Sequence, residues 1–408
     1  MGRTMLHGHM MISMLSDSAP PVSGAATYQD PDSFSMTVQG LDLTFHPQGL
    51  ARFKALIDLI DSARETLRLC FYIYAPDQVG SHVRQALEAA VNRGVRVLLI
   101  VDSFGAEVNR EFFANFCAAG GEFREFGSNW GRQYLIRNHQ KIVIADEERA
   151  MLGGFNIENS YFAPPRDNGW NDLGVMIKGP VVRDLSCWFD RLEEWTGHSR
   201  GQWRALSLMV RRWDGGKGPV RLLVGGPTRG LSSWAHSVSL DLLRASRLDM
   251  LMAYFSPSPR LRKRIRRIAR RGAARLVLAG KSDNTATIAA SRALYSRLLK
   301  ARVKLYEFQA CKLHTKLIVL DDVVYLGSAN FDMRSLYINL EIVLRIEDAA
   351  LADRMRALIG QHVSASREVT PDLYQKHASP LNRLRWWVSW FLVTVVDYTV
   401  SRRLNFGF

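Results

Sequence analysis

Two nine-residue stretches of this chain share one pattern. The first is Asn-His-Gln-Lys-Ile-Val-Ile-Ala-Asp at residues 138–146, and the second is Leu-His-Thr-Lys-Leu-Ile-Val-Leu-Asp at residues 313–321. Both follow the rule His-x-Lys-x4-Asp, and a glycine-containing turn ending in asparagine comes after each. The step from histidine to asparagine is nearly equal in the two copies, from 139 to 156 and from 314 to 330. The chain therefore carries two matching sets of an imidazole, an ammonium group and an amide.

These residue types suit attack on a phosphodiester. One imidazole can attack phosphorus, another can protonate the departing oxygen, and fixed cations and amides can hold the non-bridging oxygens. His and Lys are two positions apart in each stretch, so on a strand both point to the same face. A lysine on a buried strand is costly unless it meets an anion. The candidate catalytic residues are His139, Lys141, Asp146, His314, Lys316 and Asp321, and the candidate phosphate donors are Asn156 and Asn330.

Four carboxylates accompany these groups. Asp146 and Asp321 end apolar strands, where a structural role in a turn competes with a direct one and their position favours holding the loop. Glu341 follows Asn330 in the alternating stretch Ile-Asn-Leu-Glu-Ile at 338–342, and Asp172 follows the first asparagine in Gly-Trp-Asn-Asp-Leu-Gly. A carboxylate behind an imidazole fixes its tautomer and stabilises the imidazolium. We therefore expect Glu341 and Asp172 to support the two histidines.

The charge balance limits the partners. The 408 residues include 54 Lys+Arg and 39 Asp+Glu, a formal net charge of +15. Such a surface attracts polyanions, either nucleic acid or an anionic bilayer, and charge alone does not choose between them. The four cysteines are far apart and show no Cys-x2-Cys pairing, which disfavours a structural zinc site and a disulfide framework and favours a reducing compartment.

The strand and helix pattern is duplicated as well. In the first copy we expect helices at 47–66 and 81–92 and strands at 67–74 and 94–102. In the second copy we expect helices at 239–246 and 259–271 and strands at 248–255, 274–279 and 303–306. Alternation of this kind predicts an α/β fold made of two lobes. We expect a disordered segment at 1–30, a first lobe at 31–200, a second lobe at 201–370 and a final segment at 371–408, with residues 199–219 connecting the copies.

Two basic segments remain. The helix expected at 259–271 carries seven arginines and a lysine, which form either a solvated face or an anion-binding face. The final segment contains three tryptophans and flanking arginines around an apolar run at 386–396, which is shorter than the roughly 20 residues needed to span a bilayer. This composition suits the headgroup region of a membrane, although a helix that simply packs on the domain is the alternative.

The paired motifs resemble the phospholipase D superfamily, most closely its bacterial cardiolipin synthases, over about residues 45–350. The supporting segments include Phe-Tyr-Ile-Tyr at 71–74, Gly-Gly-Phe-Asn-Ile at 153–157, and Gly-Ser-Ala-Asn-Phe-Asp-Met-Arg-Ser at 327–335. The resemblance implies mixed β-sheets flanked by helices, two pseudo-twofold-related lobes with the active site at their junction, and no metal or other cofactor. It implies that His139 is the nucleophile and His314 the acid and base. It also implies that Glu341 supports His314, with Asp172 as its counterpart for the other histidine.

The expected function is phosphatidyl transfer between phospholipids through a phosphohistidine, with cardiolipin formed from phosphatidylglycerol and a second phospholipid or alcohol as acceptor. The expected location is peripheral, on the cytoplasmic face of the bacterial cell membrane. The chain departs from many cardiolipin synthases because it lacks two N-terminal membrane-spanning helices, so the segment 371–408 is the candidate attachment. A phospholipase D that transfers to water is the first alternative, because acceptor choice depends on how dry the pocket is. A nuclease is disfavoured by the Trp-rich segment, and a non-catalytic membrane-binding protein by the paired imidazoles.

Overall fold

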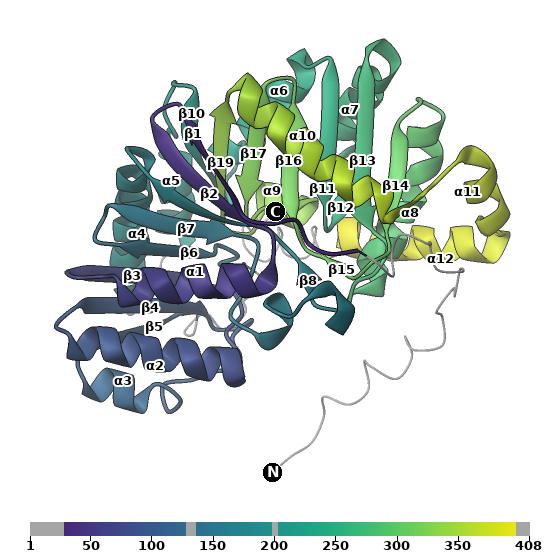
Figure 1. The fold of residues 1–408 in the computed structure, drawn as a ribbon. Coiled ribbons are helices and arrows are strands. Elements are labelled where there is room, and N and C mark those ends of the chain that lie inside the picture. Colours follow the sequence, from purple (N-terminus) through teal and green to yellow (C-terminus); the bar gives the residue numbers. More distant parts are fainter. Residues whose placement is uncertain (1–27, 128–135, 198–202, 397–408) are drawn as a thin grey trace.

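The chain folds into two lobes, each built on an eight-stranded mixed sheet (Figure 1). The computed structural model describes residues 28–127, 136–197 and 203–396. The first sheet has, in spatial order, β1 (Phe34–Val38), β2 (Leu41–His46), β9 (Gly174–Lys178), β7 (Arg149–Gly153), β6 (Ile142–Ala145), β3 (Thr66–Phe71), β4 (Arg96–Asp102) and β5 (Glu122–Phe126). The second has β10 (Val220–Gly225), β19 (Glu341–Glu347), β17 (Val323–Gly327), β16 (Lys316–Leu320), β11 (Arg247–Met252), β13 (Ala273–Ala279), β14 (Lys304–Phe308) and β20 (Ser366–Glu368).

The two sheets repeat the same topology. In the first, β3 is parallel to β4 and antiparallel to β6, and in the second β11 is parallel to β13 and antiparallel to β16. The registers correspond, because Leu67 faces Ala145 where Leu248 faces Leu320. Each histidine motif thus supplies a central strand, β6 or β16, whose residues are all buried. The expected duplicated α/β architecture is confirmed.

Helices cover both faces of each sheet. In the first lobe these are α1 (Gly49–Asp61), α2 (Gln78–Asn92), α3 (Ala114–Ala118), α4 (Val181–Gly197) and α5 (Trp203–Arg211). In the second they are α6 (Ser233–Arg244), α7 (Pro259–Arg271), α8 (Thr285–Leu299), α9 (Met333–Tyr337) and α10 (Ala349–Ser364). Short strands β8 (Trp170–Asn171), β12 (Phe255–Ser256), β15 (Lys312–Leu313) and β18 (Phe331–Asp332) lie at the strand ends.

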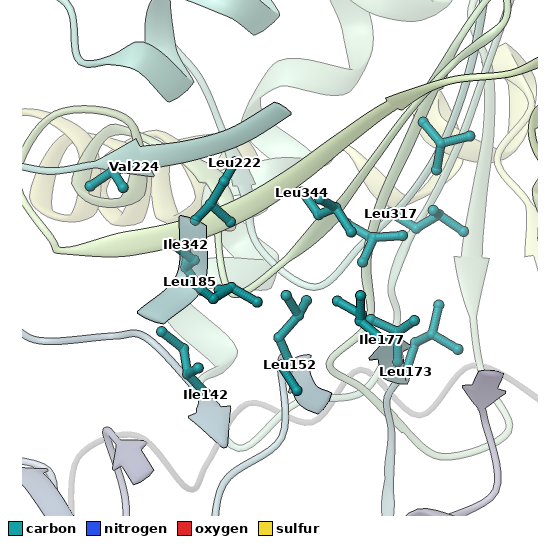
Figure 2. Packing of buried hydrophobic residues seen from close by; sticks show 14 of the residues in the cluster. Ile142, Leu152, Leu173, Ile177, Leu185, Leu222, Val224, Leu317, Ile342 and Leu344 are labelled. Carbon is teal, nitrogen blue, oxygen red and sulfur yellow. The ribbon is translucent and has the colours of Figure 1, made fainter. Parts of the chain in front are cut away.

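The lobes share one apolar core. Leu152 of β7 and Leu185 of α4 belong to the same buried cluster as Leu317 of β16 and Ile342 of β19 (Figure 2). Separate clusters fill the outer face of each lobe, under α1 and α2 in the first and under α6, α7 and α8 in the second. Since burying a large aliphatic side chain contributes about 1.5–3 kcal/mol, the shared cluster fixes the two sheets against each other.

Several expected boundaries were wrong. Helix α1 ends at Asp61 rather than at 66, because Ser62 caps it and residues 64–66 turn into β3. Helix α6 begins at Ser233 rather than at 239, with the hydroxyl of Ser232 accepting the N–H of Ala235. The expected connection 199–219 contains α5.

The expected disorder of residues 1–30 is wrong for its last three residues. Asp30 is buried and accepts a 2.7 Å hydrogen bond from Asn171 Nδ2, and the Tyr28 hydroxyl lies 3.0 Å from His362 Nε2. Residues 1–27 lie outside the described part of the chain.

The C-terminal helices α11 (Pro371–His377) and α12 (Pro380–Trp390) lie beside α8 at one side of the second lobe, and a π-helical turn, Phe391–Val396, follows (Figure 1). Trp386 is buried against Tyr374, whereas Trp387 is exposed. Within the described ranges, no helix has both the length and the apolar character required to cross a bilayer.

Candidate active site at the lobe junction

Backbone pairing between the lobes places the two histidines. The N–H of His139 donates to the carbonyl of Leu340 at 2.9 Å, and the N–H of His314 donates to the carbonyl of Asn171 at 2.8 Å. In the second case the contact is part of a short parallel pairing between β15 and β8. Each acceptor residue directly precedes a carboxylate, Glu341 or Asp172. The start of each motif strand is therefore attached to the opposite lobe.

The carboxylates consequently support the histidines in a crossed arrangement. The oxygens of Glu341 lie 3.0 and 3.1 Å from His139 Nδ1, and Asp172 Oδ2 lies 2.6 Å from His314 Nδ1. The expectation that Glu341 supports His314 and Asp172 supports His139 is wrong. The physical reason is the interlobe pairing, which carries each carboxylate across the junction. In both cases Nδ1 is engaged, so Nε2 is the nitrogen left to react.

The environments of the two carboxylates differ. Glu341 accepts hydrogen bonds from Ser328 and, at 2.7 Å, from Ser335. Asp172 accepts the N–H of Leu173 at 2.8 Å. Gly154 occupies the place that Ser328 has in the second copy, and a Cβ there would lie 2.7 Å from Asp172 Oδ1. The glycine is therefore required for close approach of the Asp172 carboxylate.

Burial and two lysines keep the imidazoles neutral. Burial lowers the pKa of His139 well below its usual value, and the charges of Lys141 and Lys316 lower it further. Burial and the same two lysines lower the pKa of His314 to about 3, against the opposing effect of Asp172. Since each imidazole is affected by both ammonium groups, the four side chains form one electrostatic cluster drawn from two lobes.

The lysines are held in an environment that disfavours their charge. Each is buried and donates to the backbone carbonyl of its own histidine, Lys141 at 2.7 Å and Lys316 in the same way. Burial lowers the pKa of Lys141 to about 7 and that of Lys316 to about 8. An anion near these groups would favour their charged forms.

The pKa values of the two carboxylates are shifted in opposite directions. Burial raises the pKa of Glu341 to about 8, with Lys141 acting against it. Burial also acts to raise the pKa of Asp172, but the charge of His314 and the hydrogen bond to it hold that pKa below the usual value. Asp172 therefore stays ionised at neutral pH and can stabilise an imidazolium at His314.

The two asparagines lie in the same cavity as the histidines. Asn156 Oδ1 accepts the N–H of Ile73 at 3.0 Å, which orients the amide. Asn330 is buried, and its Oδ1 accepts no hydrogen bond from any residue in the described ranges. Both line the cavity, in a position from which an amide N–H can reach a phosphate oxygen.

Asp146 and Asp321 lie at the other end of their strands. Asp146 accepts the backbone N–H groups of Arg64, Glu65 and Thr66, and Asp321 accepts those of Ser246 and Arg247. Neither lines the cavity. Their placement among the catalytic residues is therefore corrected, because both carboxylates anchor the turn that begins the neighbouring strand.

The cavity between the lobes has a volume of about 550 Å³. Its wall includes both histidines and both asparagines, and it extends to Leu392 and Val393 of the C-terminal turn. Most of the other polar side chains on its wall were not predicted from the sequence; they include Tyr72, Arg137, Tyr161, Tyr254, Arg334 and Asn339. A partial signal existed, since Arg137 lies just before the first motif and Arg334 lies in the segment 327–335.

Comparisons with known proteins identify the family to which the chain belongs. The family model described as "Cardiolipin synthase, PLD-like domain" matches residues 56–193 and 241–363. The chain is 27% identical over 356 residues to a cardiolipin synthase of Clostridium perfringens, covering 83% of this chain and 73% of that protein. It is 28% identical over 361 residues to cardiolipin synthase B of Escherichia coli K12, covering 86% and 85%. It is 29% identical over 333 residues to cardiolipin synthase A of Pseudomonas entomophila, covering 79% and 69%.

Solved structures show the same fold at low identity. Phosphatidylserine synthase of Haemophilus influenzae superposes with a TM-score of 0.70 at 12% identity, covering 93% of this chain and 98% of that one. Polyphosphate kinase of Porphyromonas gingivalis gives a TM-score of 0.55 at 15% identity, covering 82% and 49%. At such identities the likeness concerns the fold alone.

Proposed function

Since the chain belongs to the cardiolipin synthase family with its phospholipase D-like domain, we propose that it transfers a phosphatidyl group from phosphatidylglycerol to a second phosphatidylglycerol, giving cardiolipin and glycerol. The observation that carries this proposal is the crossed pairing of two imidazoles with two carboxylates around one cavity. Two imidazoles with free Nε2 atoms are what a two-step displacement at phosphorus requires.

In the first step His139 Nε2 attacks the phosphorus of the donor. A P–N bond forms, the P–O bond to the glycerol headgroup breaks, and protonated His314 Nε2 gives its proton to the departing oxygen. Glu341 holds the Nδ1–H of His139 and stabilises the positive charge that develops on the ring. The amides of Asn156 and Asn330 and the ammonium groups of Lys141 and Lys316 stabilise the negative charge on the pentacoordinate phosphorus.

In the second step His314 acts as the base. It takes the proton of the acceptor hydroxyl, the acceptor oxygen bonds to phosphorus, and the P–N bond breaks to regenerate neutral His139. The ionised state of Asp172 supports this assignment, because a carboxylate at Nδ1 stabilises the imidazolium that His314 must become. A phosphate in the cavity favours the same protonation.

The test uses purified protein with phosphatidylglycerol vesicles and identification of lipids by mass. Cardiolipin and glycerol are the expected products, and phosphatidic acid alone would instead show transfer to water. With labelled phospholipid and a denaturing quench at alkaline pH, where the P–N bond of a phosphohistidine survives, the wild-type protein should retain label on one histidine. His139→Gln should retain none, and a labelled adduct in that variant would overturn the nucleophile assignment. Cleavage of DNA or RNA without any lipid product would favour the nuclease alternative.

We also propose that the C-terminal helix α12 and the turn after it attach the protein to the bilayer. Exposed apolar side chains form a ridge along this segment. Their exposed fractions are 65% for Leu381, 58% for Leu384, 54% for Trp387 and 51% for Leu392. Such ridges on soluble proteins mark interaction surfaces. Because Leu392 also lines the cavity, the ridge ends where the lipid phosphate must enter.

Basic residues border this ridge. The guanidinium of Arg262 on α7 lies 5.7 Å from the ring centroid of Trp390, so the arginine-rich helix adjoins the end of α12. Exposed cations on α7 would meet anionic headgroups while the apolar ridge enters the boundary with the acyl chains. All four cysteines of the chain are free thiols, which supports placing this contact on the cytoplasmic face of the bacterial membrane.

Vesicle sedimentation tests the attachment. Replacing Leu384 and Trp387 by serine should reduce binding to phosphatidylglycerol-containing vesicles by about tenfold or more, given the apolar area removed. Leu50→Ser is the matched control, since Leu50 is 68% exposed on α1 in the other lobe. Equal binding by the double variant and the control would contradict the assignment of this surface.

A further inference from the structure

The cavity lacks the twofold symmetry of the fold around it. Two arginines line it, Arg137 two positions before His139 and Arg334 four positions after Asn330. The matching positions in the other copy are Lys312 and Ser160, and neither lines the cavity. Lys312 Nζ instead lies 3.4 Å from Asp283 and 4.6 Å from the centroid of Trp170. Positive charge is thus concentrated in one half of the cavity.

The two arginines lie in the half of the cavity that contains His139. The charge of Arg334 lowers the pKa of His139 and is felt by Tyr72, whose ring lies 5.1 Å from that of His139. Tyr72 and Arg137 are close enough for each to affect the pKa of the other. The guanidinium of Arg137 stacks 3.6 Å from the centroid of Phe104. These contacts hold Arg137 in a defined orientation at the cavity wall.

The two arginines are near enough to oppose each other. Burial lowers the pKa of Arg137, Asp102 and Tyr72 act to raise it, and the charge of Arg334 lowers it. The nearby carboxylates each accept a backbone N–H, Asp102 from Asn138 at 2.7 Å and Asp332 from Ser335 at 2.8 Å, and each also interacts with the charge of one arginine. Two like charges at a partly buried wall repel, and an anion between them relieves that cost.

We propose that Arg137 and Arg334 bind a second phosphodiester, that of the acceptor phosphatidylglycerol, while the first is bonded to His139. This inference rests on the proposed function. In the product the two phosphates are joined through one glycerol, so the acceptor's own phosphate lies only three carbons from the oxygen that attacks. Guanidinium groups suit this task because their paired N–H groups match phosphate oxygens.

The subsite recognises the acceptor by its phosphate. A donor headgroup, glycerol, brings no second anion to the cavity, and neither does water or a simple alcohol. The two arginines therefore act on the acceptor step and select a phosphorylated alcohol over an uncharged one. A cavity of about 550 Å³ can hold the reacting phosphate and a second headgroup together.

Acceptor partitioning tests the proposal. The donor is a phosphatidyl ester of p-nitrophenol in mixed micelles, offered with phosphatidylglycerol and ethanol as competing acceptors. Release of p-nitrophenol reports formation of the phosphatidyl-enzyme, and the ratio of cardiolipin to phosphatidylethanol reports acceptor choice. Arg137→Gln and Arg334→Gln should each lower that ratio by about tenfold or more, because a charge-assisted hydrogen bond is lost. Arg334→Lys should recover part of it.

Lys312→Gln is the matched control, since it removes a cation at the equivalent position outside the cavity, and its ratio should equal that of the wild type. Thermal melting identifies a variant that does not fold, and the other arginine then carries the test. If the wild type makes cardiolipin and both arginine variants partition as it does, the subsite is overturned while the proposed function stands. If the wild type makes phosphatidylethanol but no cardiolipin, both proposals fail.

Discussion

Replacing Glu341 by glutamine should disable the histidine 202 residues earlier in the chain and not the one in its own copy of the motif. Both oxygens of Glu341 lie within 3.1 Å of His139 Nδ1. The amide of glutamine fits the same space and keeps partners for Ser328 and Ser335, but it cannot ionise. Glu341, whose pKa burial raises to about 8, ionises as positive charge develops on the neighbouring ring. The perturbation therefore removes the carboxylate without leaving a cavity.

The size of the effect follows from that single contact. A hydrogen bond to a charged group contributes about 1.5–3 kcal/mol, which corresponds to roughly 10- to 150-fold in rate. The loss should appear in formation of the phosphatidyl-enzyme, because Glu341 stabilises the ring that becomes bonded to phosphorus. Asp172→Asn is the counterpart and should impair His314, the proposed acid and base.

The phosphatidyl ester of p-nitrophenol separates the two variants. Because p-nitrophenol leaves without help from an acid, formation of the covalent adduct from this donor depends on His139 and little on His314. In a rapid denaturing quench at alkaline pH, Glu341→Gln should form labelled adduct slowly, whereas Asp172→Asn should form it readily and accumulate it. His139→Gln and His314→Gln give the reference behaviour for each half of the site.

The opposite pattern would refute the reasoning. If Glu341→Gln accumulated adduct, the carboxylate would act on the histidine of its own copy, or the two histidines would have exchanged roles. The reference variants His139→Gln and His314→Gln distinguish the two explanations, because exchanged roles would make His139→Gln the variant that accumulates adduct.

Three further predictions concern stability. Asp146→Asn should lower the free energy of unfolding by about 1–2 kcal/mol, because its backbone hydrogen bonds are weakened. The kcat of the folded variant should stay near that of the wild type. A hundredfold loss of kcat at unchanged Tm would contradict this prediction. Burial lowers the pKa of His362 to about 4, so as the pH falls the unfolded chain binds a proton before the folded chain does. The free energy of unfolding should therefore fall by about 3 kcal/mol from pH 6.5 to pH 4, as followed by the denaturant midpoint. His362→Gln should not show this fall, and a pH profile parallel to that of the wild type would disprove the prediction. Leu152→Ala in the shared core and Leu276→Ala in the outer core of the second lobe should each lower the free energy of unfolding by about 2–5 kcal/mol. At a temperature where both variants are folded, kcat should fall more for Leu152→Ala. Equal kcat values would argue against a catalytic role of the junction.

Sequence patterns predicted the features that depend on neighbouring residues. The apolar run after each lysine predicted a buried strand, and β6 and β16 are buried at every position. The repeated order of strands and helices predicted two similar lobes, and the duplicated topology confirms it. Local apolar periodicity carries this information because the backbone of a strand alternates faces regardless of what the chain does elsewhere.

The partner of each histidine could not be predicted in this way. Glu341 follows His314 within the same copy of the motif, which made it the natural partner of that histidine. The actual exchange depends on two short segments, Trp170–Asn171 and the residues before Glu341, that pair with the opposite lobe. Such isolated pairings are too short to show periodicity, so only the packed structure reveals them.

The two arginines of the cavity illustrate the same limit. In the sequence Arg137 is one of many basic residues, and nothing distinguishes it from Lys312 at the matching position. The structure separates them, because Arg137 stacks on Phe104 at the cavity wall whereas Lys312 pairs with Asp283. Duplication predicts equivalent positions, but the surrounding side chains decide which of two equivalents faces the substrate.

The crossed carboxylates make the site a property of the junction rather than of either lobe. Each lobe contributes a histidine whose backbone N–H and ring nitrogen are both bound by the other lobe. A small shift of one sheet against the other would therefore disturb both imidazoles at once, although the residues within each lobe kept their own geometry. The apolar cluster that joins the sheets opposes such a shift (Figure 2). Because a packed core resists displacement, its side chains contribute to catalysis without touching substrate.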